Sequence, residues 1–394
     1  MTQRWILVFI AFATLALGEG RAEPFTPGAA AQVVERLPAV LVAPEMRELR
    51  ERRAELSRDP RNLDLAVELA WRYIKLGRAE FDPRYYGYAQ AALAPWWDAA
   101  EPPTTVLLLR ATLLQNRHDF TGALVDLENL LRRDPRNGQA WLTRAVVLAV
   151  RAEYDAALRS CLPLGRLAGA LLASACSANA LNLQGHAERG YGLLQQVLAR
   201  YPAAPVAERL WALTLLAEIA ARQGQAEQAE AHYQQALALG ERDVYLLMAY
   251  ADFLLDQDRA AAAQALLANE TRVDPLFLRL VLAEQRLNAA ALPEHRAAMQ
   301  ARFEEARLRG DRTHLGDGAR FALYLQHQPE QALRMALANW EQQREPRDAR
   351  WVLEAALAAG DRDAARPVLE WLRANRVEDV RLSALAQRLK EIPG

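Results

Sequence analysis

The stretch Trp141–Cys161, WLTRAVVLAVRAEYDAALRSC, decides the fold. Ala145 and Ala157 each stand among larger apolar residues, on either side of a short break in the pattern. Two antiparallel helices approach closely only where side chains are small, and large apolar residues three and four positions away fill the gaps around the crossing. The stretch therefore predicts a helix-turn-helix pair whose helices cross at these two alanines.

The same marker recurs along the chain at a nearly constant period. Spacings of 34, 33, 39 and 34 residues separate the small residues of the predicted first helices, which are Ala111, Ala145, Ala178, Ala217 and Ala251. The same four spacings separate those of the predicted second helices, which are Ala123, Ala157, Gly190, Ala229 and Ala263. Both series of small residues contain the same single longer spacing of 39 residues, and this agreement indicates stacked structural repeats.

The residues around these markers resemble the tetratricopeptide repeat family. The copy quoted above continues the pattern as Trp141-x2-Arg144-Ala145-x2-Leu148, then Tyr154, then Ala157-x3-Cys161. The family pattern is Trp-x2-Leu-Gly-x2-Tyr followed by Ala-x3-Phe in about 34 residues. The resemblance is to an exported bacterial member, and it implies an all-α, right-handed superhelix (a solenoid) of about eight or nine helix pairs without a sheet.

The sequence predicts four segments. Residues 1–22 form a signal peptide, and residues 23–57 form an N-terminal extension with one helix over Glu45–Leu56. Residues 58–268 carry the clear repeats, and residues 269–394 carry degenerate repeats that end in a capping helix over Val380–Leu389. Terminal repeats are expected to be atypical because one of their faces meets solvent.

The N-terminus indicates export. Arg4 precedes the apolar run Trp5–Leu17, and small residues at Gly20 and Ala22 fit a cleavage site before Glu23, with Ala16 and Gly18 as a second possible site. The run is shorter than the roughly 20 residues that span a bilayer. We therefore expect a periplasmic or secreted protein without a membrane span.

Composition and motifs argue against several functions. The formal net charge is -1, which does not suggest a nucleic-acid partner. The six histidines show no metal-binding helical spacing, and no nucleophile elbow, Cys-x-x-Cys or phosphate loop is present. We therefore expect a protein that is not an enzyme, with no catalytic, cofactor-binding or metal-binding residues.

The resemblance implies that the concave face, formed by the first helices, binds a segment of another protein as an extended peptide or amphipathic helix. By the family's geometry this groove should include Trp71, Lys75, Leu108, Thr112, Gln115, Asn116, Thr143, Val146, Asn179, Asn182, Glu218, Arg222, Met248, Asp252 and Asp256. A free C-terminus is not the expected ligand, since basic partners for Asn179 are missing nearby. The alternatives are a structural subunit of an envelope assembly with the groove unused, and a cell-wall enzyme built on a solenoid.

Two features remain open at this level. Cys161 and Cys176 lie in neighbouring predicted helices, either as buried thiols or as a disulfide, which export to an oxidising compartment would permit. The aromatic segment Tyr85–Trp97 either forms a binding surface or fills a gap left by an irregular connection.

The first testable prediction concerns export. The native protein, isolated from its own cells, should begin at Glu23, because cleavage after Ala22 removes the apolar segment. N-terminal sequencing of the protein from the extracytoplasmic fraction measures this directly. A chain that keeps Met1 and stays in the cytosolic fraction would contradict the prediction.

Overall fold

The computed structural model describes residues 44–310, 313 and 315–392, so the predicted signal peptide and most of the N-terminal extension lie outside the described residues. The chain divides into two units, Met1–Glu51 and Arg52–Gly394. Helix α2 (Pro44–Arg58) includes the helix expected over Glu45–Leu56. Everything described below concerns the second unit.

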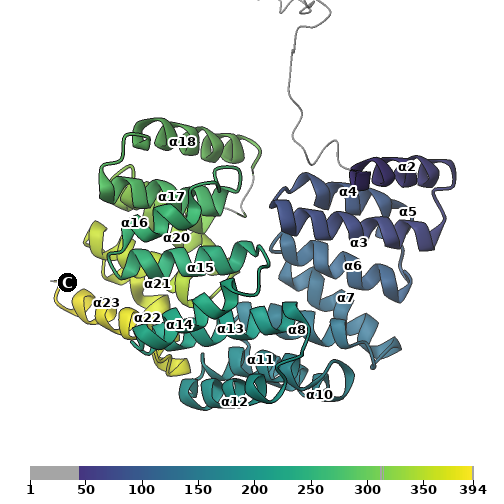
Figure 1. The fold of residues 1–394 in the computed structure, drawn as a ribbon, viewed down its shortest axis with the longest axis horizontal. Coiled ribbons are helices and arrows are strands. Elements are labelled where there is room, and N and C mark those ends of the chain that lie inside the picture. The colour runs from purple at the N-terminus through teal and green to yellow at the C-terminus, as the bar shows by residue number, and fades with distance from the viewer. Residues whose placement is uncertain (1–43, 311–312, 314, 393–394) are drawn as a thin grey trace, which may run out of the picture. The chain divides into compact units, whose positions relative to one another are not determined.

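Every regular element of the described residues is helical, and consecutive helices pack in pairs (Figure 1). The pairs are α3 (Leu63–Glu80) with α4 (Arg84–Ala92), α6 (Thr104–Asn116) with α7 (Phe120–Arg133), α8 (Gly138–Val150) with α9 (Tyr154–Cys161), α11 (Ala170–Leu181) with α12 (Ala187–Arg200), α13 (Val206–Arg222) with α14 (Ala226–Leu237), α15 (Val244–Asp256) with α16 (Ala260–Leu267), α17 (Asp274–Leu287) with α18 (Leu292–Leu308), α19 (Leu315–Tyr324) with α20 (Pro329–Gln342), and α21 (Pro346–Ala359) with α22 (Arg366–Asn375). Short helices α5 (Ala94–Trp97), α10 (Leu164–Leu167) and η1 (Asp363–Ala365) lie in connections, and α23 (Val380–Lys390) comes last. The predicted all-α array of tetratricopeptide-like pairs is confirmed.

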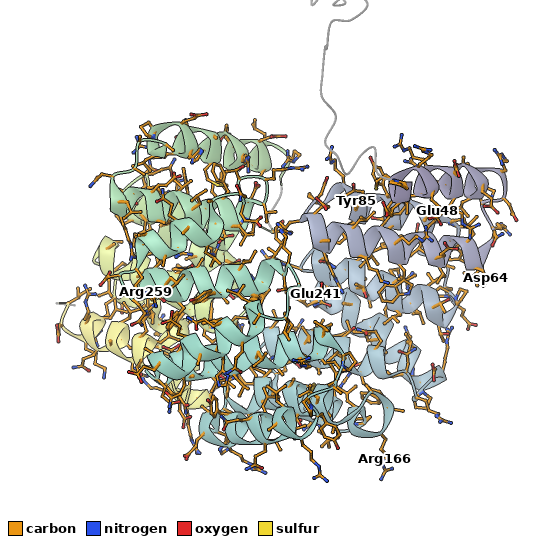
Figure 2. All side chains as sticks on the ribbon, viewed as in Figure 1. Glu48, Asp64, Tyr85, Arg166, Glu241 and Arg259 are labelled. Carbon is orange, nitrogen blue, oxygen red and sulfur yellow. A yellow bond between two sulfur atoms is a disulfide. The ribbon has the colours of Figure 1, made fainter. Side chains whose placement is uncertain are left out.

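The helices cross at the small residues that set the period. The alanines of the first helices, Ala111 to Ala251, are at most 3% exposed, and those of the second helices are at most 1% exposed. Gly190 serves the same purpose in α12, where an added Cβ would lie 3.2 Å from the carbonyl oxygen of Ala178 in α11. Charged residues such as Asp64 and Arg259 instead project into solvent (Figure 2). None of the described helices is both long and apolar enough to cross a membrane.

The aromatic segment is more regular than the sequence indicated. Arg84–Ala92 forms α4, the second helix of the first pair, rather than an irregular connection. Tyr85 is buried and its ring lies 6.3 Å from that of Tyr73 in α3. Gly77 of α3 leaves room for Tyr86, whose ring would otherwise lie 2.6 Å from an added Cβ. Tyr85 and Tyr86 thus pack against α3, and Tyr88 places its ring 5.5 Å from that of Tyr73 while it remains 39% exposed.

The C-terminal helices contact the middle of the array. The indole Nε1 of Trp371 in α22 donates to the hydroxyl of Tyr154 in α9 at 3.1 Å. The backbone N–H of Arg344 donates to the carbonyl oxygen of Val150 at 2.7 Å. One hydrophobic cluster includes buried side chains of α8, α9 and α11 together with those of α19 to α23. The array therefore closes on itself from α8 onward, and first helices face one another across its interior.

A disulfide joins two consecutive repeats. Cys161, the last residue of α9, is bonded to Cys176 in α11, with their Cα atoms 5.7 Å apart. Both residues are at most 4% exposed. The bond encloses α10, so the short connection between the two repeats is fixed at both ends.

Removing this bond should destabilise the array without changing its fold. A Cys161→Ala/Cys176→Ala variant should lose up to about 3 kcal/mol of unfolding free energy, because the link across 15 residues no longer restricts the unfolded chain. Chemical denaturation measures this change, and a reducing agent should lower the stability of the wild type alone. Two free thiols per chain in denatured, unreduced native protein would contradict the assignment.

Candidate functional site

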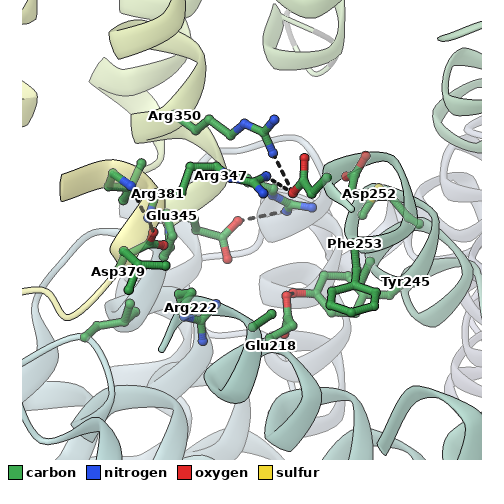
Figure 3. A pocket seen from close by; sticks show the side chains of 18 of the residues that line it. Glu218, Arg222, Tyr245, Asp252, Phe253, Glu345, Arg347, Arg350, Asp379 and Arg381 are labelled. Carbon is green, nitrogen blue, oxygen red and sulfur yellow. Dashed lines mark hydrogen bonds and ion pairs between the residues drawn. The ribbon is translucent and has the colours of Figure 1, made fainter. Parts of the chain in front are cut away.

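An inner cavity of about 290 Å³ lies where the array closes on itself (Figure 3). Helices α8, α11, α13 and α15 line one side of it, and the N-terminal ends of α21 and α23 line the other. Its walls are chemically mixed, since aromatic and aliphatic side chains such as Tyr245, Met248 and Trp351 alternate with charged ones. Such a combination of apolar walls with a few placed polar groups is typical of binding sites.

The structure brings only part of the predicted groove to this cavity. The predicted residues that line it are Val146, Asn179, Glu218, Arg222, Met248, Asp252 and Asp256. Those of α3 and α6 do not line it, and they are Trp71, Lys75, Leu108, Thr112, Gln115 and Asn116. Thr143 and Asn182 are buried in the helices beside it. The first helices therefore do not form one continuous groove, because α3 and α6 contribute no residue to the cavity lining.

Several of the predicted polar groups are used within the array. The hydroxyls of Thr112 and Thr143 donate to the carbonyl oxygens of Leu108 and Gln139, one turn back in their own helices. The amide of Asn182 donates to the carbonyl oxygen of Asn179 at 2.8 Å. These donors are therefore used within the array and are not free for a ligand.

The side chain of Asn179, by contrast, has no hydrogen-bond partner among the described residues and lines the cavity. Arg222 is held by one contact, from its Nη2 to Oδ1 of Asn182 at 2.8 Å. Its Nε is buried and has no hydrogen-bond partner in the described part of the chain. Free donors therefore remain on the α11–α13 side of the cavity.

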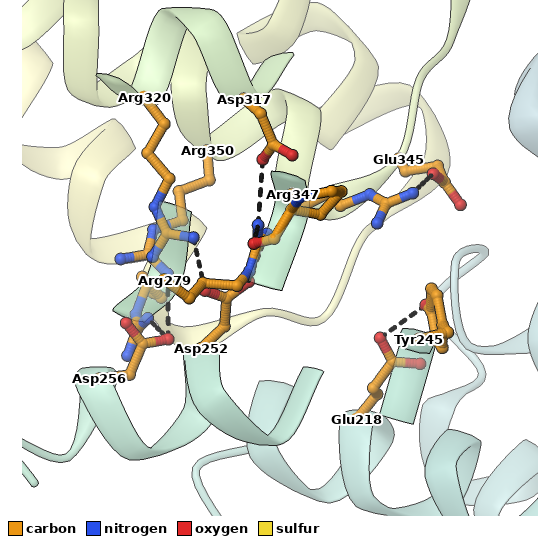
Figure 4. A network of polar contacts seen from close by, with 12 residues as sticks. Glu218, Tyr245, Asp252, Asp256, Arg279, Asp317, Arg320, Glu345, Arg347 and Arg350 are labelled. Carbon is orange, nitrogen blue, oxygen red and sulfur yellow. Dashed lines mark hydrogen bonds and ion pairs between the residues drawn. The ribbon is translucent and has the colours of Figure 1, made fainter. Parts of the chain in front are cut away.

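Asp252 anchors a buried network behind the cavity wall (Figure 4). Its carboxylate accepts from Nε and Nη2 of Arg279 at 3.0 and 2.9 Å, and from Nη1 of Arg320. Nη1 of Arg279 also donates to Asp317 at 3.1 Å. Burial alone would raise the pKa of Asp252, but the two guanidinium charges outweigh it and lower the pKa to about 2. Asp252 therefore has a structural role that the sequence did not indicate.

Asp256 links the array to the C-terminal helices. Its Oδ2 accepts from Nη1 of Arg350 in α21 at 3.0 Å and forms an ion pair with Arg381 in α23. Arg350 also donates to Glu354 at 2.8 Å. One carboxylate of α15 thus holds two helices that are about a hundred residues further along the chain, as the separation of 94 between Asp256 and Arg350 indicates.

The N-terminal ends of α21 and α23 bring further acidic groups to the same place. Asp379 caps α23 by accepting from the N–H groups of Arg381 and Leu382, both at 2.9 Å. Glu345 and Asp348 form a capping box at α21. Burial, aided by the charge of Glu345, raises the pKa of Asp348 to about 7. Each of these groups is positioned by a helix start rather than by a loop.

The sequence did not reveal the basic residues of this site. Arg347, Arg350 and Arg381 line the same cavity as Asn179, and the absence of basic groups directly beside Asn179 stays a prediction. These arginines lie in the degenerate C-terminal repeats, and their approach depends on the closure of the array. The described residues contain no group of three or more His, Cys, Asp or Glu side chains placed to hold a metal ion.

Loss of the Asp256 carboxylate should loosen this closure. Asp256→Asn should lower the unfolding free energy by about 1–3 kcal/mol, because two arginines lose a charged hydrogen-bond acceptor. The same change at Asp258, whose side chain is 99% exposed, should cost less than about 0.5 kcal/mol. Chemical denaturation gives both values, and hydrogen exchange should quicken in α23 for Asp256→Asn alone. Equal effects of the two changes would count against the link.

Comparisons with known proteins find similar structures but assign no family to the chain. No family model matches the chain, and no curated protein matches it. A tetratricopeptide repeat protein from Parabacteroides merdae is 15% identical over 64% of this chain and 94% of its own, with a TM-score of 0.44. Cut9 in the Cut9–Hcn1 assembly of the APC/C is 14% identical over 84% of this chain and 63% of its own, with a TM-score of 0.47.

Human IFIT1, solved as a dimer with m7Gppp-AAAA, is 14% identical over 88% of this chain and 85% of its own, with a TM-score of 0.45. All three TM-scores lie below 0.5, so the fold must be judged on the chain's own features. Those features are consecutive helix pairs that cross at small residues about 34 positions apart. On that evidence the chain has a tetratricopeptide-like α-solenoid fold.

Proposed function

We propose that this protein is an exported scaffold that binds a segment of another protein in the inner cavity. The observation that carries the proposal is that inner-face side chains from four consecutive first helices line one cavity of mixed polar and apolar character. Among them, Asn179 has no hydrogen-bond partner in the described residues. An amide with free donors and acceptors beside apolar walls suits a peptide backbone with one anchoring side chain.

Two features support the exported setting. The N-terminal sequence has the order of a secretory signal, with a basic start, an apolar run and small residues before Glu23. The Cys161–Cys176 disulfide fits an oxidising compartment, since such bonds are rare in the cytosol. The two arguments are independent, because one rests on the leader and the other on the array.

The size of the cavity limits what enters it. A volume of about 290 Å³ lies at the lower end of the range of small-molecule sites, which is roughly 300–1,000 Å³. It admits one or two side chains rather than a whole helix. We therefore expect a short segment of the partner to insert, while the rest of the partner stays outside.

Filling the cavity should abolish partner binding. Ala221 lines the cavity near the end of α13, and Ala207 is exposed at the start of the same helix. Ala221→Phe should reduce capture of the partner from an envelope extract more than tenfold, whereas Ala207→Phe should capture as the wild type does. Mass spectrometry of proteins retained by the tagged mature chain measures both.

Overpacking can cost about 1–3 kcal/mol, so thermal unfolding must accompany each capture. Asn179→Ala provides a second variant, because its side chain bonds to no other described residue and its removal should leave the melting temperature unchanged. If Ala221→Phe and Asn179→Ala both capture the same proteins as the wild type, the cavity is not the binding site. The structural-subunit alternative predicts instead that the mature protein assembles with itself and captures nothing through this cavity.

A further inference from the structure

The inner cavity holds one more negative group than positive groups. Four guanidinium groups line it, from Arg222, Arg347, Arg350 and Arg381. Five carboxylates line it, from Glu218, Asp252, Asp256, Glu345 and Asp379. The side chains that line the cavity therefore carry a summed formal charge of -1 when every group is ionised. The location of this excess decides what charge a ligand should carry.

Three of the five carboxylates already have basic partners. Asp252 accepts from Arg279 and Arg320, as described above. Asp256 is paired with Arg350 and Arg381. Glu345 accepts from Nη2 of Arg347 at 2.8 Å, and the guanidinium of Arg347 lies 5.7 Å from the ring centre of Tyr245. Asp317, which pairs with Arg279, and Glu354, which pairs with Arg350, complete the balance, so five carboxylates meet five guanidinium groups and no charge is left for a ligand.

Glu218 and Asp379 are different, because neither has a basic group of the described residues within ion-pair distance. Glu218 accepts only from the hydroxyl of Tyr245, at 2.9 Å. Asp379 is 8% exposed and accepts only from the two backbone N–H groups that it caps. Arg222 is the remaining cation, and its recorded hydrogen bond is to the neutral Asn182. Arg347 and Arg350 also attract these carboxylates, but both already pair with other acidic groups, so Arg222 is the one cavity guanidinium without an ion-pair partner among the described residues.

Burial makes this imbalance costly. The loss of solvent raises the pKa of Glu218 and of Asp379, and their hydrogen bonds and the attraction of nearby arginines only partly oppose it. Asp379 is buried and Glu218 is half-buried, and a carboxylate that is partly removed from water without an ion-pair partner costs free energy that a positive group in the cavity would recover. The described residues offer no three-ligand metal cluster, which favours an organic cation over a metal ion.

We propose that the partner segment inserts a basic side chain, lysine or arginine, into the inner cavity, with its charge facing Glu218 and Asp379. This inference rests on the proposed function and adds the chemistry of the inserted group. The aliphatic stem of such a side chain packs on apolar surface while its charged end stays among polar groups. Tyr245, Met248 and Phe253 supply that surface in the cavity.

Capped tripeptides test the charge directly. The probes are acetyl-Gly-Arg-Gly-amide, its lysine and glutamate counterparts, and the neutral isostere with citrulline in place of arginine. The full mature chain is titrated with each probe and followed by NMR to millimolar concentrations. We expect the arginine and lysine probes to bind at least tenfold more tightly than the citrulline and glutamate probes.

Two substitutions remove the charges and preserve the other contacts. Glu218→Gln keeps an acceptor for Tyr245, and Asp379→Asn keeps a residue that caps a helix about as well as aspartate. Together they should weaken the basic probes about tenfold and leave the citrulline probe unchanged. The matched controls are Glu208→Gln, in the same helix as Glu218 but outside the cavity lining, and Asp119→Asn, the cap of α7. Both controls should bind as the wild type does.

The outcomes separate this inference from the proposed function. If the arginine probe binds no more tightly than the citrulline probe, or if the double variant binds it unchanged, the inference is wrong. If the glutamate probe binds best, Arg222 rather than the acidic pair selects the ligand, and the inference is again wrong. In either case the loss of capture in Ala221→Phe would still stand on its own as evidence for the cavity.

Discussion

Close approach of paired helices is the constraint on which the rest of this structure depends. A helix pair packs tightly only if neither helix carries a large side chain at the crossing, so Ala111, Ala145 and Ala178 recur at a fixed place. Gly190 marks the tightest of these approaches, because an added Cβ would lie only 3.2 Å from the carbonyl oxygen of Ala178. Each crossing fixes the direction in which the next pair stacks. The positions of all inner-face side chains follow from it.

Ion pairs hold the C-terminal helices against the middle of the array. The C-terminal helices reach the array through arginines, and Asp256 receives two of them. Behind it, Arg279 is 1% exposed and is acceptable there only because Asp252 and Asp317 surround it. The cavity that remains is therefore bounded by pairs whose geometry is already fixed. Glu218 and Asp379 are the exceptions, and they face the open space that the closure leaves.

The sequence predicted the features that are local to a repeat. The helix pairs, their crossings and the final helix at Val380 all follow from patterns within about 34 residues. The resemblance to tetratricopeptide repeats placed Asn179, Arg222 and Met248 on an inner face, and they do line the cavity. The sequence did not predict that Arg347, Arg350 and Arg381 line the same cavity, because no sequence pattern indicates how far the array curves before its C-terminal helices contact its middle. The structural role of Asp252 escaped for the same reason, since Arg320 is 68 residues away.

The contact between Trp371 and Tyr154 changes how such an array should come apart. An ordinary repeat protein is held by neighbour contacts only, so its ends fray and its middle unfolds independently. Here residues 217 positions apart share a hydrogen bond inside one hydrophobic cluster. Repeats from α8 onward are therefore linked to the last helices through side chains, and the loss of those helices should expose apolar surface in the middle. Cooperative unfolding of this region therefore depends on the contacts between the last helices and the middle of the array. Helices α8 and α9 gain those contacts only once the chain extends as far as α22.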